Sequence, residues 1–180
     1  LKAHVYPWLN ERTETGKDTG DYATWLRRWW QPQKSREDFF AATAGKRRVI
    51  VCSNPQARPV FVFLSTEFVP TNTLQIFGFE DDYTFGVIQS SLHWEWTKAK
   101  GGRVRADYRY TTKVWRSFPW PQEPADAHIA SVATAARELR RVRHTLMEEN
   151  GWSLRQLYQA AEVEGPHPLK DAQAVLDASV

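Results

Sequence analysis

A chain of 180 residues with 42% apolar content is long enough to bury the core of one globular domain, or of one domain with a small appendage. Its single cysteine, Cys52, excludes an internal disulfide framework and the thiol-rich zinc patterns, and its five histidines do not fall at metal-ligand spacing. The formal net charge of +3 is too small by itself to indicate a nucleic-acid partner, so the placement of the charges matters more than their sum.

The ends of the chain and its hydropathy bear on where the protein works. The first residue is Leu1 rather than methionine, so we expect both ends to be cuts through a longer polypeptide. The polar start does not resemble a signal peptide, and no run of about eighteen apolar residues predicts a membrane span. Because a single thiol suits a reducing compartment, we expect a soluble, cytoplasmic protein with no membrane partner.

The first half of the chain is predicted to contain a short helix and three strands. Residues 1–20 indicate a short helix followed by a loop, and residues 24–30 are dense in tryptophan. Residues 49–51 and 60–64 are β-branched or aromatic runs on either side of a turn-rich segment, which predicts two adjacent strands. A third extended run covers residues 73–79.

A helical period begins near Asp82. The apolar positions that recur every three or four residues are Phe85, Ile88, Leu92 and Trp96. They predict one core-facing helix, with Asp81 or Asp82 as its N-cap, that ends at Gly101 and Gly102. Residues 103–110 then alternate charged and aromatic side chains, as a strand or ribbon does.

The last third of the chain is predicted to be helical. It follows the segment Phe118-Pro119-Trp120-Pro121, whose prolines mark a rigid extended boundary. Residues 126–149 carry an amphipathic stripe about six turns long. A capping box starts a second helix at Ser153 and Gln156, and a last helix covers residues 169–180.

These elements predict an α+β fold in two parts. A mixed α/β domain with a small sheet and a core helix is expected over residues 1–121. A C-terminal helical region is expected over residues 122–180.

No catalytic centre is apparent. There is neither a glycine-rich cofactor loop nor an Asn/Asp-Pro-Pro-aromatic motif, and Asn54-Pro55 suits a plain turn. The acids at residues 80–82 and 148–149 suit a helix-capping turn and a solvated helix end better than acid–base catalysis. Cys52 suits inert strand packing and His93 a structural role in the core. We therefore expect that the chain is not an enzyme by itself and holds no metal or cofactor.

Basic residues are concentrated around the double glycine. Between residues 91 and 120 the basic side chains are Lys98, Lys100, Arg103, Arg105, Arg109, Lys113 and Arg116, against Glu95 and Asp107. Arginine forks read guanine, carboxylates read cytosine, and other basic groups neutralise phosphates. Because alternate strand positions share a face, Arg103, Arg105 and Asp107 are expected to point the same way. Ordinary solvated strand charges explain the composition equally well.

A second basic group lies on the helix predicted over residues 126–149. Its members are Arg137, Arg140, Arg141 and Arg143. They spread around the helix rather than forming one stripe, so we expect them to be solvated or to pair with another domain.

The order and spacing of three stretches resemble a known family. Residues 81–93, 105–111 and 118–121 are similar to the target recognition region of class I AdoMet-dependent DNA methyltransferases from bacterial type II, MmeI-like restriction-modification enzymes. Residues 153–158 and 169–177 resemble the C-terminal helical region of that family. A Met-Pro pair that the family has after Tyr158 is absent here.

The resemblance implies a module that reads double-stranded DNA and delivers an adenine to a methyltransferase domain of the same polypeptide. AdoMet is then expected in the parent enzyme, and some family members also cleave DNA. By position, base reading is expected from Arg103, Arg105, Asp107, Asn72 and Arg48, the last two more weakly. Phosphate contacts are expected from Lys98, Lys100, Arg109, Lys113, Arg116 and Arg47.

Two other functions remain open at this stage. A protein-interaction module could dock to the rest of a multidomain enzyme without reading bases. A free-standing nuclease would require magnesium-dependent cleavage by this chain, which we do not expect.

Overall fold

The computed structural model describes residues 2–14, 25–27, 29, 36–71 and 73–180. The chain forms two compact units, residues 1–44 and residues 45–180. In the first unit, helix α1 (Lys2–Glu14) agrees with the short helix predicted there, whereas helix α3 (Glu37–Thr43) was not predicted. The tryptophan-dense stretch lies largely outside the described residues.

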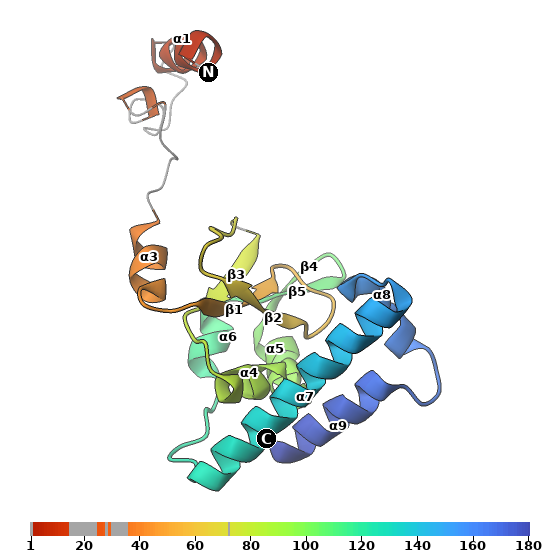
Figure 1. The fold of residues 1–180 in the computed structure, drawn as a ribbon. Coiled ribbons are helices and arrows are strands. Elements are labelled where there is room, and N and C mark those ends of the chain that lie inside the picture. The colour runs from red at the N-terminus through yellow and green to blue at the C-terminus, as the bar shows by residue number, and fades with distance from the viewer. Residues whose placement is uncertain (1, 15–24, 28, 30–35, 72) are drawn as a thin grey trace. The chain divides into compact units, whose positions relative to one another are not determined.

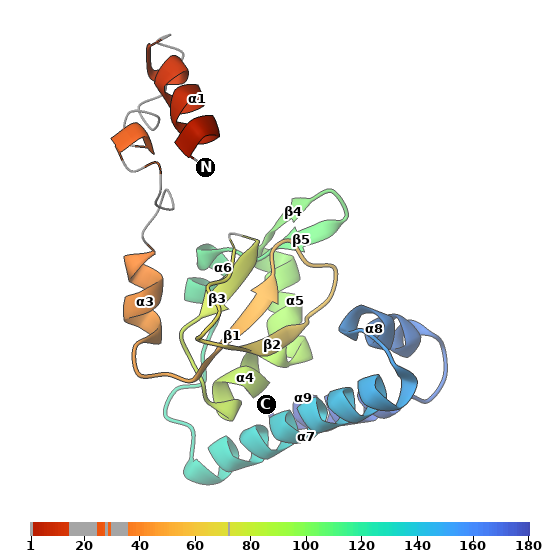
Figure 2. The same cartoon turned by 45° about the horizontal axis from the view of Figure 1, so that its top comes forward.

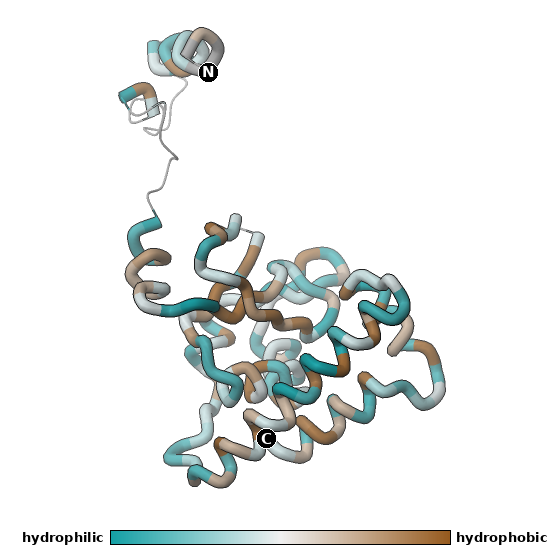
Figure 3. The backbone as a smooth tube through the Cα atoms, viewed as in Figure 1, coloured by the Kyte–Doolittle hydropathy of each residue, from teal (hydrophilic) through white to brown (hydrophobic). Residues whose placement is uncertain are grey.

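The second unit is built on a three-stranded antiparallel sheet in the order β2-β1-β3 (Figure 1). Its strands are β1 (Arg48–Ser53), β2 (Phe61–Ser65) and β3 (Leu74–Phe77), so all three predicted strands are confirmed. The central strand β1 pairs Ile50 with Phe63 on one side and with Phe77 on the other. Figure 3 shows these strands as a strongly hydrophobic part of the chain, which is typical of a buried sheet.

The single helix predicted from Asp82 to the double glycine is wrong. The structure has two helices, α4 (Asp82–Gln89) and α5 (Ser91–Lys100), separated at Ser90, whose ψ angle of 154° is extended. The Ser90 hydroxyl accepts a hydrogen bond from the backbone N–H of His93 at 3.3 Å and thereby caps α5. The break changes the helical phase, so that Leu92, predicted to face the core, is 61% exposed.

A two-stranded hairpin and a short helix follow α5. The hairpin consists of β4 (Gly102–Val104) and β5 (Asp107–Arg109), which confirms the predicted ribbon. Helix α6 (Thr112–Ser117) was not predicted. The predicted extended boundary does follow it, and there Phe118 is buried while Trp120 packs against Trp115 at 4.7 Å between ring centroids.

Three helices complete the unit: α7 (Asp126–Asn150), α8 (Leu154–Glu162) and α9 (Pro168–Ser179). The capping box predicted at Ser153 and Gln156 is present. Helices α7 and α9 lie side by side in both views, with α4 between α7 and the sheet (Figures 1 and 2). The alternation of helices with small antiparallel sheets confirms the predicted α+β class.

The C-terminal helices share one core with the sheet. Leu139 and Leu176 are fully buried in the same cluster as Phe85 and Ile50. Compactness therefore divides the chain after residue 44 rather than after residue 121. Whether residue 121 bounds a functional domain stays a prediction.

Three helices of this core approach one another closely at Gly86 of α4. A Cβ atom at this position would lie 2.6 Å from Val132 Cγ1, and 3.2 Å from side-chain atoms of Ala136 and Leu176. Glycine therefore lets α4 approach α7 and α9 closely enough to bury the apolar faces of all three helices.

We predict that Gly86→Ala lowers the free energy of unfolding by about 1–3 kcal/mol, because overpacking outweighs the higher helix propensity of alanine. Denaturant titration of the purified chain measures the change. The control is Gly102→Ala on β4, where an added Cβ has open space and should leave stability nearly unchanged. Equal stability of the two variants would contradict the proposed close packing.

His93 has the structural role that the sequence suggested. Its ring is fully buried, and Nε2 lies 3.0 Å from the hydroxyl of the buried Tyr110. Burial disfavours the charged imidazolium and lowers the pKa of His93 from 6.5 to about 4.

This shift predicts a pH-dependent stability. As pH falls below about 6.5, His93 becomes protonated in the unfolded chain but stays neutral in the folded chain. The free energy of unfolding should therefore fall, by up to about 3 kcal/mol at pH 4. Denaturant unfolding at pH 7 and pH 4.5 tests this. His93→Gln should reduce the pH dependence, whereas His144→Gln on the exposed face of α7 should not. An unchanged pH dependence in His93→Gln would refute the assignment.

Candidate nucleic-acid interface

The β4–β5 hairpin carries the three residues singled out most strongly by the sequence. It projects from the end of α5 (Figure 2). Arg103 lies opposite Tyr108, Val104 lies opposite Asp107, and Arg105 lies in the two-residue connection between the strands. Arg105 has a φ angle of 57°, in the left-handed region that residues other than glycine seldom adopt.

The expectation that Arg103, Arg105 and Asp107 share one strand face is wrong. The chain reverses direction at Arg105, so the three residues do not belong to one strand. Residues directly opposite each other in a hairpin share a face, and successive residues alternate. Arg103 therefore lies on the face of Tyr108, and Asp107 lies on the opposite face with Val104.

Arg103 is held in place by aromatic contacts. Its guanidinium lies 4.6 Å from the ring centroid of Tyr108 and donates a hydrogen bond of 2.6 Å to the Tyr108 hydroxyl. Tyr108 in turn packs edge-on against Trp94 of α5 at 5.3 Å. Stacking on an aromatic ring restricts an arginine and leaves its outer N–H groups available.

The hairpin is tied to the loop after β1 by Gln56. The backbone N–H of Gln56 donates to the Tyr108 carbonyl, and the Tyr108 N–H donates to the Gln56 carbonyl, both at 2.9 Å. Sequence reasoning missed Gln56, because a turn-rich segment gives no local signal for a pairing 52 residues further along the chain.

A groove of about 470 Å³ lies beside this junction. Its apolar lining includes Val51, Val62 and Leu74 of the three-stranded sheet, and Val60, which precedes β2. Its polar lining comes from Ser53, Gln56, Arg58, Asp107 and Arg155. The groove therefore joins the predicted base reader Asp107 to residues that the sequence did not single out.

Five of the six predicted phosphate contacts lie on α5, β5 and α6. Lys98 and Lys100 are in the last turn of α5, Arg109 ends β5, and Lys113 and Arg116 are on α6. Lys98 forms an ion pair with Glu95 at 2.5 Å, and Lys100 lies 5.2 Å from the Trp96 ring. Arg109, Lys113 and Arg116 are exposed. Their role in phosphate binding stays a prediction.

Residues 34–122 match the family model described as the target recognition domain of MmeI. This stretch of the chain is an MmeI-type target recognition domain. Most of the chain is also similar in fold to the solved structure of the type IIL restriction-modification enzyme MmeI in complex with DNA. The TM-score is 0.75 at 21% identity, over 91% of this chain and 21% of that one.

A curated relative extends the likeness to sequence. The chain is 31% identical over 111 residues to DNA methyltransferase A of Bacillus subtilis (strain 168). The match covers 61% of this chain but only 12% of the relative, so this chain corresponds to a small part of that protein.

The other predicted DNA contacts of the target recognition domain lie outside the hairpin. The Arg48 guanidinium lies 3.7 Å from the Phe63 ring centroid, donates to the Glu80 carbonyl at 3.0 Å, and pairs with Asp82 at 3.2 Å. These contacts give Arg48 a structural role. Arg47 is exposed, and its backbone N–H donates to the Glu80 carboxylate at 3.1 Å. Asn72 lies outside the described residues.

The arginines of α7 were expected to be solvated or to pair with another domain, and solvation is wrong for two of them. Arg143 is 4% exposed and donates to the Phe61 carbonyl at 2.9 Å. Arg140 forms a close ion pair with Asp82, and burial lowers the pKa of its guanidinium. Their apolar surroundings come from β2 and α4, which sequence periodicity within α7 could not reveal. Arg141 is exposed and pairs with Glu138 at 2.6 Å.

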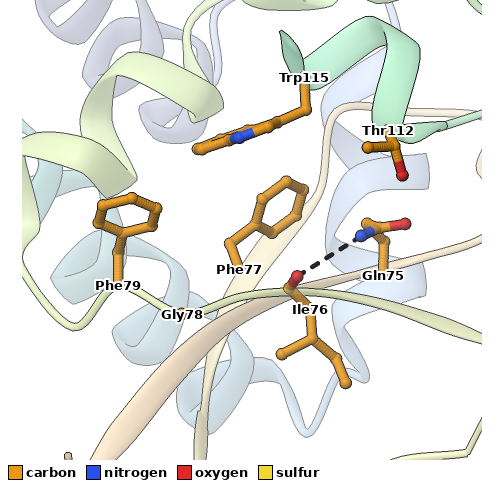
Figure 4. A pocket seen from close by; sticks show the side chains of 7 residues that line it. All are labelled: Gln75, Ile76, Phe77, Gly78, Phe79, Thr112 and Trp115. Atoms are coloured by element: carbon orange, nitrogen blue, oxygen red, sulfur yellow. Dashed lines mark hydrogen bonds between the residues drawn. The ribbon is translucent and has the colours of Figure 1, made fainter. Parts of the chain in front are cut away.

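A smaller pocket of about 140 Å³ lies between β3 and α6 (Figure 4). Trp115 lies beside Phe77 and Phe79, with ring centroids 5.0 and 5.7 Å away. Gln75 and Thr112 line the other side, and the Gln75 amide donates to the neighbouring Ile76 carbonyl at 3.5 Å. These aromatic contacts fix α6 against the edge of the sheet.

The described residues contain neither a membrane-spanning helix nor a metal-binding cluster. In that part of the chain no helix is both long and apolar enough to cross a bilayer. Nor do three His, Cys, Asp or Glu side chains gather there closely enough to hold a metal ion. Cys52 is buried in β1, and burial raises its thiol pKa to about 12, as an inert packing residue requires.

Asp82 forms ion pairs with three arginines, and this predicts that its carboxylate stabilises the target recognition domain. Its carboxylate, 13% exposed, pairs with Arg48, Arg137 and Arg140. Asp82→Asn should lower the free energy of unfolding by roughly 1–3 kcal/mol, because the clustered guanidinium groups then repel one another without a counter-charge. Thermal unfolding measures the loss.

The matched control is Glu138→Gln, which removes one carboxylate from an exposed pair on α7. Exposed pairs contribute little, so this variant should unfold like the unmodified chain. If Asp82→Asn is as stable as Glu138→Gln, the arginine cluster does not depend on Asp82.

Proposed function

We propose that this chain is the DNA-recognition module of a bacterial restriction-modification methyltransferase, and that it directs chemistry carried out by domains outside the chain. The observation that carries the proposal is the match to the target recognition domain family over residues 34–122, which contains the whole hairpin. The name of the structural relative, an enzyme in complex with DNA, supports the same proposal.

The hairpin has the chemistry that sequence reading requires. Two-stranded ribbons fit the major groove of B-DNA, where arginine forks pair with guanine. Arg103 is restrained on Tyr108, and Arg105 is exposed at the hairpin turn, with no ion pair to any described residue. Lys98, Lys100 and Arg109 adjoin the hairpin and are suited to phosphates on either side.

The rest of the enzyme follows from the family. We propose that a methyltransferase domain of the same polypeptide binds AdoMet and modifies an adenine that this module helps to position, in the bacterial cytoplasm. The chain itself then needs no cofactor and performs no catalysis. Cleavage of DNA belongs to the parent only if a nuclease domain is also present.

A protein-interaction module is the competing function. The observation that favours it is an apolar turn after β2, where Phe68 is 61% and Val69 is 52% exposed. Such side chains suit contact with another domain of the parent. This contact and DNA reading use different residues, so the following experiment separates them.

In the intact parent enzyme, Arg103→Ala and Arg105→Ala should change the methylated sequence, whereas Lys98→Ala and Arg109→Ala should weaken binding to all sequences alike. Loss of one base contact costs about 1–3 kcal/mol, and loss of one phosphate contact lowers the slope of log affinity against log salt by about 1. Sequencing of methylated sites and salt titrations of DNA binding give the two readouts.

Arg141→Ala provides the control, because Arg141 is an exposed arginine paired within α7. It should alter neither the methylated sequence nor the salt slope. If both hairpin arginine variants methylate the original sequence with unchanged preference, the hairpin does not read DNA.

A further inference from the structure

The groove beside the hairpin contains a buried polar group without a partner. Gln56 is 5% exposed, and both its side-chain oxygen and its side-chain nitrogen lack a hydrogen-bond partner among the described residues. Its backbone N–H and carbonyl are both used by Tyr108. Buried amides are almost always hydrogen-bonded, so an amide whose two ends are both free calls for a ligand.

The groove has the size and the lining of a binding site. Its volume of about 470 Å³ lies within the range of ligand pockets. Sheet residues such as Val62 and Leu74 give it an apolar lining. Gln56 and Asp107 bring an amide and a carboxylate to the same wall.

The groove also has basic lining residues. Arg155 lines the groove from the first turn of α8, is exposed, and has no ion pair within the described part of the chain. Arg58 also lines the groove, but Glu162 holds its guanidinium through two hydrogen bonds. Arg155 is therefore the guanidinium that remains available for an anionic ligand group.

We propose that this groove accepts a nucleotide edge of the DNA, that Gln56 reads an adenine of the recognition sequence, and that Arg155 contacts a phosphate beside it. This inference rests on the proposed function. A side-chain amide can donate and accept at once, which matches adenine N7 and N6. A base edge in the groove gives both ends of the Gln56 amide a partner and places Asp107 next to the neighbouring base pair.

The proposal explains the junction between Gln56 and the hairpin. Because the backbone of Gln56 pairs with Tyr108 on β5, the amide is fixed relative to Arg103 and Asp107. Arg103 lies on one face of the hairpin, and Asp107 lies on the other and lines the groove with Gln56. Specificity is thus divided between the hairpin and the loop after β1.

The test uses the intact parent enzyme and sequencing of its methylated sites. Gln56→Leu keeps the backbone pairing with Tyr108 but removes the amide, so it should relax one adenine position by about 5- to 150-fold. Gln56→Glu replaces a donor with an acceptor and should move that position towards cytosine. Arg155→Ala should weaken binding to all sequences and reduce its salt dependence.

Gln75→Leu is the matched control, because Gln75 lines the separate pocket between β3 and α6 and should leave every position unchanged. Thermal unfolding of each variant identifies loss of structure, and Gln56→Met, which keeps the length of the side chain, replaces Gln56→Leu if that variant unfolds. If the Gln56 variants methylate fewer sites but with the original sequence preference, Gln56 is structural and the inference is overturned.

Arg105→Ala separates this inference from the proposed function. If Arg105→Ala changes the methylated sequence and the Gln56 variants do not, only the role of Gln56 fails. If neither variant changes it, and Lys98→Ala leaves the salt dependence unaltered, both proposals fail.

Discussion

The second compact unit depends on how the edge strand β2 is fixed to the helices. At Phe61 the backbone N–H donates to the Gln89 side chain of α4 at 3.0 Å, and the carbonyl accepts from Arg143 of α7 at 2.9 Å. These backbone groups face no neighbouring strand, and buried peptide groups require partners. Arg143 also donates to the Tyr158 hydroxyl of α8, so a single buried guanidinium joins the sheet to two helices. Its charge is stabilised by hydrogen bonds and aromatic rings, with no carboxylate partner among the described residues.

This arrangement separates stability from recognition. The residues that hold the unit together, such as Gly86, His93 and Arg143, are buried on α4, α5 and α7. Arg103 and Arg105 lie on an exposed hairpin whose strands contact each other and the loop at Gln56 through the backbone. We therefore expect substitutions of these proposed reading side chains to leave the core and the hairpin backbone intact. A rigid scaffold with a replaceable reading surface can acquire new sequence preferences at little cost in stability.

Local patterns predicted most of the elements, because strands, caps and amphipathic helices are encoded by nearby residues. The capping box at Ser153 and the three strands are examples. The break at Ser90 was missed because the apolar period continues through it, although the Ser90 side chain caps a new helix. The burial of Arg143 was missed for a different reason. Its partners Phe61 and Tyr158 lie on other elements, and no pattern within α7 indicates them.

At the candidate site, too, a local sequence pattern did not predict how the side chains are arranged. Alternation placed Arg103 and Asp107 on one face, but the reversal at Arg105 puts them on opposite faces. Two side chains on opposite faces of a narrow ribbon cannot contact the same base pair edge in the same way. Arg103 belongs with Tyr108 and Trp94, whereas Asp107 belongs with the groove and Gln56. The proposed reading residues are therefore grouped by the fold rather than by sequence spacing, and our proposal assigns the loop after β1 to the recognition surface together with the hairpin.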